Sequence, residues 1–272
     1  MINFLHAFTP EPILISIGPF SVYWYGIFIV TGILLAILVI FKLADFYKIP
    51  KNTIIDLIFY LIIGGIIGAR IYHVFLELPY YLNNPLNTVK FWNGGLAIHG
   101  ALLFGIIILW LFTKKKKLNF WQISAILAPG LALAQAVGRW GNYFNQEIFG
   151  KPTNLSWGIP IEPANRMIEF YNAQFFHPTF LYESIGSFII FAILIIIHIY
   201  IIKNKKTNNY YFFLTLAFYL TAYSFLRFCL EFIRIDITPI IFGLRTPQIA
   251  SLLIILVIFL LLPKFKKNVN LK

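Results

Sequence analysis

Seven apolar runs, each close to the length that crosses a lipid bilayer, constrain this chain more than any other feature of its sequence. About 20 apolar residues in helical conformation span a hydrocarbon core. Such segments fold as helices because the bilayer interior offers no other partner for backbone polar groups. We therefore predict an all-α fold, a polytopic bundle of seven transmembrane helices. The expected spans are residues 19–41, 54–76, 95–113, 121–138, 179–202, 210–233 and 248–262.

The composition agrees with a membrane protein: 60% of the residues are hydrophobic, 12% are charged, and the mean hydropathy is +0.80. Soluble domains carry about twice that share of charge. No Lys or Arg precedes the first apolar run, so that run lacks the basic start of a cleaved signal peptide, and we expect it to be retained. A single cysteine, Cys229, excludes a disulfide within the chain.

Lysine placement predicts the orientation in the membrane. Fourteen of the sixteen lysines fall in alternate loops and in the tail, on one side of the expected spans. They are Lys42, Lys48, Lys51, Lys114, Lys115, Lys116, Lys117, Lys203, Lys205, Lys206, Lys264, Lys266, Lys267 and Lys272. Because cytoplasmic loops are enriched in positive charge, we expect the N-terminus outside and the C-terminus in the cytoplasm. The net charge of +12 thus reflects topology, and we expect no nucleic-acid partner.

The six arginines follow a different pattern from the lysines. Four of them lie at or beyond the outer ends of the expected spans, and Arg70 and Arg227 lie inside spans. The guanidinium group keeps its charge and offers a planar fork that matches phosphate or carboxylate. This distribution indicates an anionic partner on the outer side of the membrane.

One segment without a spanning pattern, residues 139–177, interrupts the helices. Its turn-rich sequence predicts a small external, head-like insertion within a single transmembrane domain of residues 1–272, rather than a second globular domain. Within the second span, Gly64 and Gly68 have the spacing of small residues at helix contacts, and we interpret them as packing positions.

Polar side chains of five spans fall at one depth, in the outer part of the membrane. They are Arg70, His73, His99, Arg139, His177, Tyr182, Glu183, Arg227 and Glu231. The inner halves are nearly bare, with Asp56 and His198 as exceptions. A charged residue at the bilayer centre costs about 2.5–3.5 kcal/mol on insertion scales. We therefore predict that these groups share a polar cavity open to the outer leaflet.

The sixth expected span carries a polar stripe. Tyr219, Tyr223, Arg227, Glu231 and Arg234 follow one another at helical spacing, so they share a face. We expect Arg227 and Glu231, four residues apart, to form an ion pair. An alternative interpretation is that this pair only holds helices together.

The predicted cavity has the residues for phosphate-ester chemistry. Arginines at headgroup level suit a phosphate diester, and His99, which follows Gly94 and Gly95, is a candidate base for a thiol or an alcohol. We predict no metal site, because the histidines lack the local spacing of one, and no cofactor. The GxSxG motif of serine hydrolases is absent from the sequence.

Residues 138–150, GRWGNYFNQEIFG, concentrate polarity between glycines at the end of the fourth span. A helix that continues through this stretch puts Arg139, Asn142 and Gln146 on one face. A turn at Gly141 would regroup them. The spacing alone leaves both conformations open.

Several motifs resemble one known family. GRWGNYFNQEIFG resembles a signature of the prolipoprotein diacylglyceryl transferases, and FWNGGLAIHGALLFG at 91–105 resembles their histidine-containing block. YWYG at 23–26, IGARIYHV at 67–74, HPTFLYES at 177–184 and YSFLRFCLEFIR at 223–234 are similar to further motifs of the family. The resemblance covers essentially the whole chain.

The resemblance implies a reaction and a set of residues. The diacylglyceryl group of phosphatidylglycerol would move to the lipobox cysteine thiol of a prolipoprotein signal peptide, and glycerol phosphate would leave. His99, Arg139 and Arg227 would be the catalytic residues. Substrate binding would involve Arg139, Arg227, Asn142, Asn145, Glu147, Tyr223, Glu231, Arg70, Tyr25 and Tyr182. The implied partners are phosphatidylglycerol, prolipoprotein signal peptides and the lipid bilayer, in the bacterial cytoplasmic (inner) membrane.

Two other function classes use similar residues. A phospholipid flippase or a channel would need polar groups through the full depth of the membrane, and the bare inner halves of the spans disfavour both. Another phospholipid headgroup transferase is the second alternative.

Overall fold

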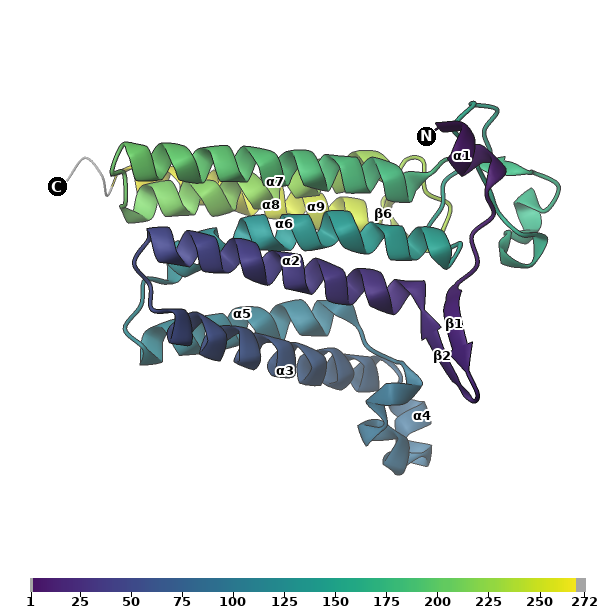
Figure 1. Ribbon diagram of the computed structural model, residues 1–272, viewed down its shortest axis with the longest axis horizontal. Coiled ribbons are helices and arrows are strands. Elements are labelled where there is room, and N and C mark those ends of the chain that lie inside the picture. Colours follow the sequence, from purple (N-terminus) through teal and green to yellow (C-terminus); the bar gives the residue numbers. More distant parts are fainter. Residues whose placement is uncertain (1, 268–272) are drawn as a thin grey trace. The chain divides into compact units, whose positions relative to one another are not determined.

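The computed structural model describes residues 2–267 and contains seven helices that are long and apolar enough to cross a membrane. This confirms the prediction of an all-α bundle. The helices are α2 (Trp24–Phe46), α3 (Lys51–Leu76), α5 (Ile98–Lys115), α6 (Phe120–Phe144), α7 (Thr179–Lys203), α8 (Asn209–Leu230) and α9 (Thr246–Lys267) (Figure 1). Lys272, one of the lysines used to predict orientation, lies outside the described residues.

The chain divides into two compact units. Unit 1 comprises Met1–Ile40 and Ala125–Lys272, and unit 2 comprises Phe41–Ser124. The chain passes from unit 1 to unit 2 within α2 and returns within α6. Each unit is described separately below.

In unit 1, α8 packs against α7 and α9, and the three helices run side by side in green and yellow in Figure 1. Small residues bring the remaining helices close. A Cβ added to Gly32 of α2 would lie 3.1 Å from the carbonyl oxygen of Ala134 in α6. Ala128 and Ala132 of α6 are fully buried against Leu194 of α7 and other apolar side chains. These short side chains let α6 occupy the middle of unit 1.

Helix α6 extends six residues past the expected end of its span, from Gly138 to Phe144. The apolar run stops at Arg139 because that residue is charged, but the helix continues. Trp140, Tyr143 and Phe144 supply the reason, since they pack into an apolar cluster formed by the following segment. Of the two conformations that the sequence left open, the structure therefore shows the continuing helix at Gly141, not the turn.

This apolar cluster joins the small elements that follow α6 to Leu5 of α1 (Ile2–Ala7), Tyr143 of α6 and Phe180 of α7. Strands β3 (Ile159–Pro160) and β4 (Phe175–Phe176) pair antiparallel, with the short 3₁₀ helices η3 (Pro163–Asn165) and η4 (Ile168–Phe170) between them. Phe176 is fully buried at its centre. Unit 1 also contains the antiparallel pairs β1 (Ile13–Ile17) with β2 (Phe20–Tyr23) and β5 (Ile240–Ile241) with β6 (Leu244–Arg245).

Unit 2 is built on the pairing of α3 with α5. Gly64 faces Ile108, and Gly68 faces Phe104 and the backbone of Gly100. The predicted packing role of these two glycines is confirmed. Three short helices connect α3 to α5: α4 (Leu78–Asn83), η1 (Pro85–Val89) and η2 (Phe91–Asn93).

Candidate functional site

A cluster of arginines and acids lies in unit 1 where α6 and α8 end and α7 and α9 begin. We call it the arginine cluster; its members are Arg139, Glu183, Arg227, Glu231, Arg234, Asp236 and Arg245. The members come from α6, α7, α8 and the segment that joins α8 to α9.

Glu183, in the second turn of α7, is the centre of the cluster. Its side chain is only 2% exposed. Oε1 lies 2.7 Å from a guanidinium nitrogen of Arg139 and accepts a 2.8 Å hydrogen bond from the hydroxyl of Tyr223. Oε2 lies 3.8 Å from Arg227 and 3.9 Å from Arg234. One buried carboxylate therefore joins α6, α7 and the end of α8.

Glu231 forms a second centre just after the end of α8. Its side chain is fully buried, and Oε2 lies 3.0 Å from a guanidinium nitrogen of Arg227. The predicted ion pair between these residues is confirmed. Oε1 lies 3.1 Å from Nε of Arg245, the residue that ends β6. Glu231 therefore ties α8 to the segment that leads into α9.

Asp236 is the third acid of the cluster and lies outside the spans. Arg234 donates a 2.7 Å hydrogen bond to its Oδ1, and Arg245 lies 3.5 Å from its Oδ2. Burial opposes ionisation of Asp236, but the hydrogen bond and the charges of the two arginines outweigh it and hold its pKa below the usual value.

The charges of the arginine cluster do not cancel. Four guanidinium groups face three carboxylates, which leaves one positive charge in surroundings that are largely desolvated. A fourth carboxylate, of Glu147, is exposed and is linked to Arg139 only through Asn142. Arg139 is the most exposed of the four arginines, with 23% of its side chain accessible, whereas Arg234 is 5% exposed. A buried charge is costly unless it is paired, so the surplus favours an anionic ligand at the exposed arginine.

The stretch from Arg139 to Glu147 forms a polar chain that begins at this exposed arginine. Arg139 donates a 3.1 Å hydrogen bond to Oδ1 of Asn142, one helical turn later. Asn142 in turn donates a 2.7 Å hydrogen bond to Glu147, and Asn145 lies 3.5 Å from the same carboxylate oxygen. The chain thus binds Nη1 of Arg139, while Glu183 contacts Nη2.

Gln146 leaves this chain because the backbone turns after α6. Its φ is +51°, in the left-handed region, so its side chain does not continue the face of Arg139 and Asn142. Instead its amide donates to the carbonyl of Pro10 at 2.8 Å and accepts from the backbone N–H of Glu162 at 2.7 Å. Gln146 thus anchors the N-terminal segment to the loop after α6.

Two predicted tyrosines also lie in unit 1. Tyr25, at the start of α2, packs directly against Gly141, where an added Cβ would come within 2.7 Å of its ring. Tyr182 accepts a 2.8 Å hydrogen bond from the indole of Trp157 and lies 3.2 Å from Nδ1 of His177. Burial lowers the pKa of His177, which favours the neutral imidazole in this contact.

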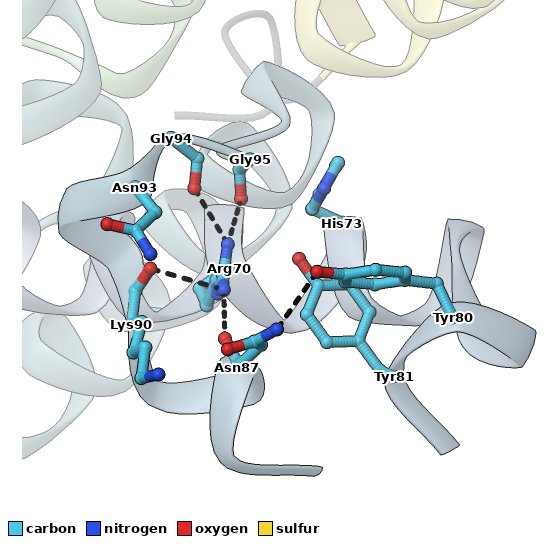
Figure 2. Close-up of a pocket in the computed structure, with 9 residues that line it drawn as sticks. All are labelled: Arg70, His73, Tyr80, Tyr81, Asn87, Lys90, Asn93, Gly94 and Gly95. Carbon is cyan, nitrogen blue, oxygen red and sulfur yellow. Dashed lines mark hydrogen bonds between the residues drawn. The ribbon is translucent and has the colours of Figure 1, made fainter. Parts of the chain in front are cut away.

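Two other predicted residues, Arg70 and His99, belong to unit 2. Arg70 is 9% exposed near the end of α3. His99 is the second residue of α5, and its ring centroid lies 6.0 Å from that of Tyr72. His73 and Arg70 help to line a cavity of about 150 Å³ between α3 and the segment 80–95 (Figure 2). Whether these residues share a cavity with Arg139 and Arg227 stays a prediction.

Among the residues that the structure describes, no group of three or more His, Cys, Asp or Glu is placed to hold a metal ion. The chemistry of the arginine cluster is that of anion binding by guanidinium groups and amides.

A family model described as prolipoprotein diacylglyceryl transferase matches residues 12–263. The chain belongs to this family. A phosphatidylglycerol–prolipoprotein diacylglyceryl transferase of Staphylococcus aureus (strain MSSA476) is 41% identical over 249 residues, 91% of this chain and 86% of that protein. A protein of the same name from Nostoc sp. (strain PCC 7120) is 38% identical over 247 residues, 90% of this chain and 85% of its own length.

As a member of the prolipoprotein diacylglyceryl transferase family, the chain is a multi-pass membrane transferase, as the sequence motifs indicated. The structure brings most of the predicted residues together in unit 1. These are Tyr25, Arg139, Asn142, Asn145, Glu147, Tyr182, Tyr223, Arg227 and Glu231.

Sequence reasoning did not assign site roles to four residues that the structure places in the arginine cluster: Glu183, Arg234, Asp236 and Arg245. The sequence held a signal for two of these residues. Glu183 ends the motif HPTFLYE, and Arg234 continues the polar stripe of α8. Arg245 lies beyond any helical pattern, and only the fold of the segment 231–245 brings it to Glu231.

Proposed function

We propose that this protein transfers the diacylglyceryl group of phosphatidylglycerol to the cysteine thiol in the lipobox of a prolipoprotein signal peptide. A carbon–sulfur bond forms between the cysteine and the glyceryl carbon, the bond from that carbon to the phosphate oxygen breaks, and glycerol phosphate leaves. The thiol proton passes to a base. The surplus positive charge of the arginine cluster carries this proposal, because the leaving group is a phosphate ester.

Arg139 and Arg227 are the phosphate-binding residues in this proposal. Glu183 contacts both guanidinium groups and Glu231 pairs with Arg227, so neither side chain has to be ordered when the lipid binds. Preorganised charges of this kind stabilise the developing negative charge of a leaving group without rearranging. Asn142, Asn145 and Glu147 orient Arg139 and the headgroup, and Tyr223 and Tyr25 support the same face.

His99 is the proposed base for the acceptor thiol. Imidazole ordinarily titrates near pH 6.5 and a cysteine thiol near 8.5, so a neutral histidine within reach accepts the proton as sulfur attacks. His99 is the second residue of α5 in unit 2.

We further propose that the enzyme resides in the bacterial inner membrane with the cavity toward the outer leaflet and residues 139–177 as an external head within a single transmembrane domain. The lysine distribution supports this orientation, with the N-terminus outside and the C-terminus in the cytoplasm. Signal peptides that emerge on the outer side would then meet the cavity.

The proposal is tested with purified protein, phosphatidylglycerol labelled in its acyl chains, and a lipobox peptide. Wild-type protein is expected to label the peptide cysteine, and Arg139→Ala is expected to lower transfer at least a hundredfold because it removes a charge from the phosphate site. Lys151→Ala, which removes an exposed positive charge after the same helix, is the matched control and is expected to keep the wild-type rate.

Absence of label from the peptide, with a folded wild-type protein, would overturn the proposed reaction. Label on another acceptor, or lipid movement between leaflets without label, would instead favour a different headgroup transferase or a flippase.

A further inference from the structure

Arg70 is enclosed by main-chain carbonyl groups of the segment that connects α3 to α5. Figure 2 shows its guanidinium group surrounded by the carbonyls of Asn87, Lys90, Gly94 and Gly95. The distances are 2.7 Å to Gly94, 3.0 Å to Gly95 and 3.4 Å to Lys90, and Nε donates to Thr88 at 2.9 Å. We call this arrangement the Arg70 clamp.

The clamp occupies the full donor capacity of Arg70. A guanidinium group has five N–H donors, and five carbonyl oxygens accept from it. The ring of Tyr81 covers one face, with its centroid 5.1 Å from the guanidinium carbon. A lipid phosphate would therefore have to displace existing hydrogen bonds to reach this side chain.

The clamped segment leads directly to the proposed base. Gly95 is two residues before Ala97, whose N–H donates to the carbonyl of Ala69 at 3.1 Å, next to Arg70 in the chain. Helix α5 begins at Ile98, and His99 is its second residue. Arg70 thus holds the backbone of residues 87–95. That backbone leads into the first turn of α5 and so determines the position of His99.

We propose that Arg70 is a positioning residue that acts through His99, and that it does not bind the lipid phosphate itself. The expected effect of Arg70 on the transfer rate rests on the proposed function. The expected effect of Arg70 on the order of residues 87–95 rests only on the clamp. Lysine and glutamine at this position separate the two roles. Lysine keeps the positive charge that attracts a phosphate, but neither side chain can replace a planar fork with five donors.

The first test compares Arg70→Lys with Arg70→Gln by hydrogen–deuterium exchange. Both substitutions are expected to raise exchange in residues 84–97 to the same extent, while the central turns of α3 and α5 stay protected. Arg166→Lys is the matched control, because Arg166 also donates to two main-chain carbonyls, of Ile161 and Tyr171, in unit 1. It is expected to leave exchange of residues 84–97 unchanged.

The second test measures kinetics of the same variants. Arg70→Lys and Arg70→Gln are both expected to lower kcat about a hundredfold with little change in KM for phosphatidylglycerol, since a misplaced base costs this much without affecting lipid binding. Arg166→Lys, the control of the exchange experiment, is expected to keep the wild-type kcat and KM, because Arg166 donates to main-chain carbonyls outside the clamp.

The pH profile distinguishes a displaced base from a simple loss of folded protein. The wild-type rate is expected to level off above the range in which imidazole titrates, and the Arg70→Lys rate to rise further toward pH 8.5, as the thiol ionises by itself. His99→Gln is expected to share the second profile. Among the described residues, Tyr72 of α3 is a titratable group in ring contact with His99.

Gly95→Ala provides a second variant in case Arg70 variants fail to fold. Gly95 has a φ of +72°, and an added Cβ would lie 2.7 Å from a guanidinium nitrogen of Arg70 and 2.6 Å from His73. It is expected to loosen the clamp and to reproduce the raised exchange and the altered pH profile.

The proposal is overturned if Arg70→Lys retains the wild-type rate and exchange while Arg70→Gln raises KM for the lipid, because Arg70 would then be a charge contact. It is also overturned if both variants leave the exchange of residues 84–97 unchanged. A wild-type protein that transfers no label would count against the proposed function, while the exchange experiment would still decide the clamp.

Discussion

Glu183 shows how much of this site depends on single residues. Its sequence position indicated only a polar group at the same depth as several others. The structure makes it the common partner of Arg139, Tyr223, Arg227 and Arg234. Helical spacing predicted the pair Arg227–Glu231, since both residues lie on one helix. Partners from different helices have no such spacing, so the sequence could not predict which arginines Glu183 contacts.

We expect Glu183→Gln to destabilise unit 1 by about 3 kcal/mol, the usual cost of removing one partner from a buried ion pair. The substitution keeps the shape of the side chain but leaves four guanidinium groups with two carboxylates. Thermal unfolding in detergent measures the effect. Glu169→Gln, which removes an exposed carboxylate of η4, is the control and should leave the midpoint unchanged. Equal midpoints for the two variants would contradict the central role of Glu183.

At the scale of elements, close contacts between helices depend on glycine. The sequence spacing of Gly64 and Gly68 predicted a contact face on α3, and the structure confirms it. The sequence spacing did not identify the partner of this face. In the structure, Gly100 of α5 meets Gly68 backbone to backbone. The helical continuation of α6 through Gly141 likewise depends on aromatic packing after the apolar run, which hydropathy does not detect.

Gly100→Ala is expected to separate α3 from α5, because the added Cβ would meet the carbonyl of Gly68 and backbone cannot move aside as a side chain does. We expect a loss of at least 2 kcal/mol, on the order of an overpacked core. Gly65→Ala is the matched control: nothing lies within 4 Å of its added Cβ, and replacing a helical glycine stabilises by about 0.5–1 kcal/mol. Thermal unfolding of both variants checks that Gly100→Ala lowers the midpoint and that Gly65→Ala raises it.

At the scale of the whole molecule, the two units carry different parts of the proposed chemistry. The arginine cluster belongs to unit 1, and the Arg70 clamp with His99 belongs to unit 2. Both α2 and α6 run from one unit into the other, so the units are joined through continuous helices. The lysine distribution predicts the orientation of these helices in the membrane, and this prediction can be measured directly.

We expect a cysteine at Leu155, in the loop after α6, to react with an external reagent in intact cells. A cysteine at Lys115, at the end of α5, is expected to react only after the membrane is opened. Leu155→Cys and Lys115→Cys are compared in a Cys229→Ser background with a membrane-impermeant maleimide. The result follows from positive charge on cytoplasmic loops. If only Lys115→Cys is labelled in intact cells, the predicted orientation is wrong and the cavity faces the cytoplasm.

The sequence by itself determined the helical class, the seven spans and the family, and it predicted three members of the arginine cluster, Arg139, Arg227 and Glu231. Hydropathy and helical spacing carry this information because a bilayer and an α-helix impose fixed lengths and periods on the chain. Only the tertiary structure decided which charges meet. It joined Glu183 to three arginines and brought Arg245 to Glu231, and it enclosed Arg70 in carbonyl groups that leave no N–H for a lipid. Contacts between residues of separate elements depend on packing, and no local pattern in the sequence records them.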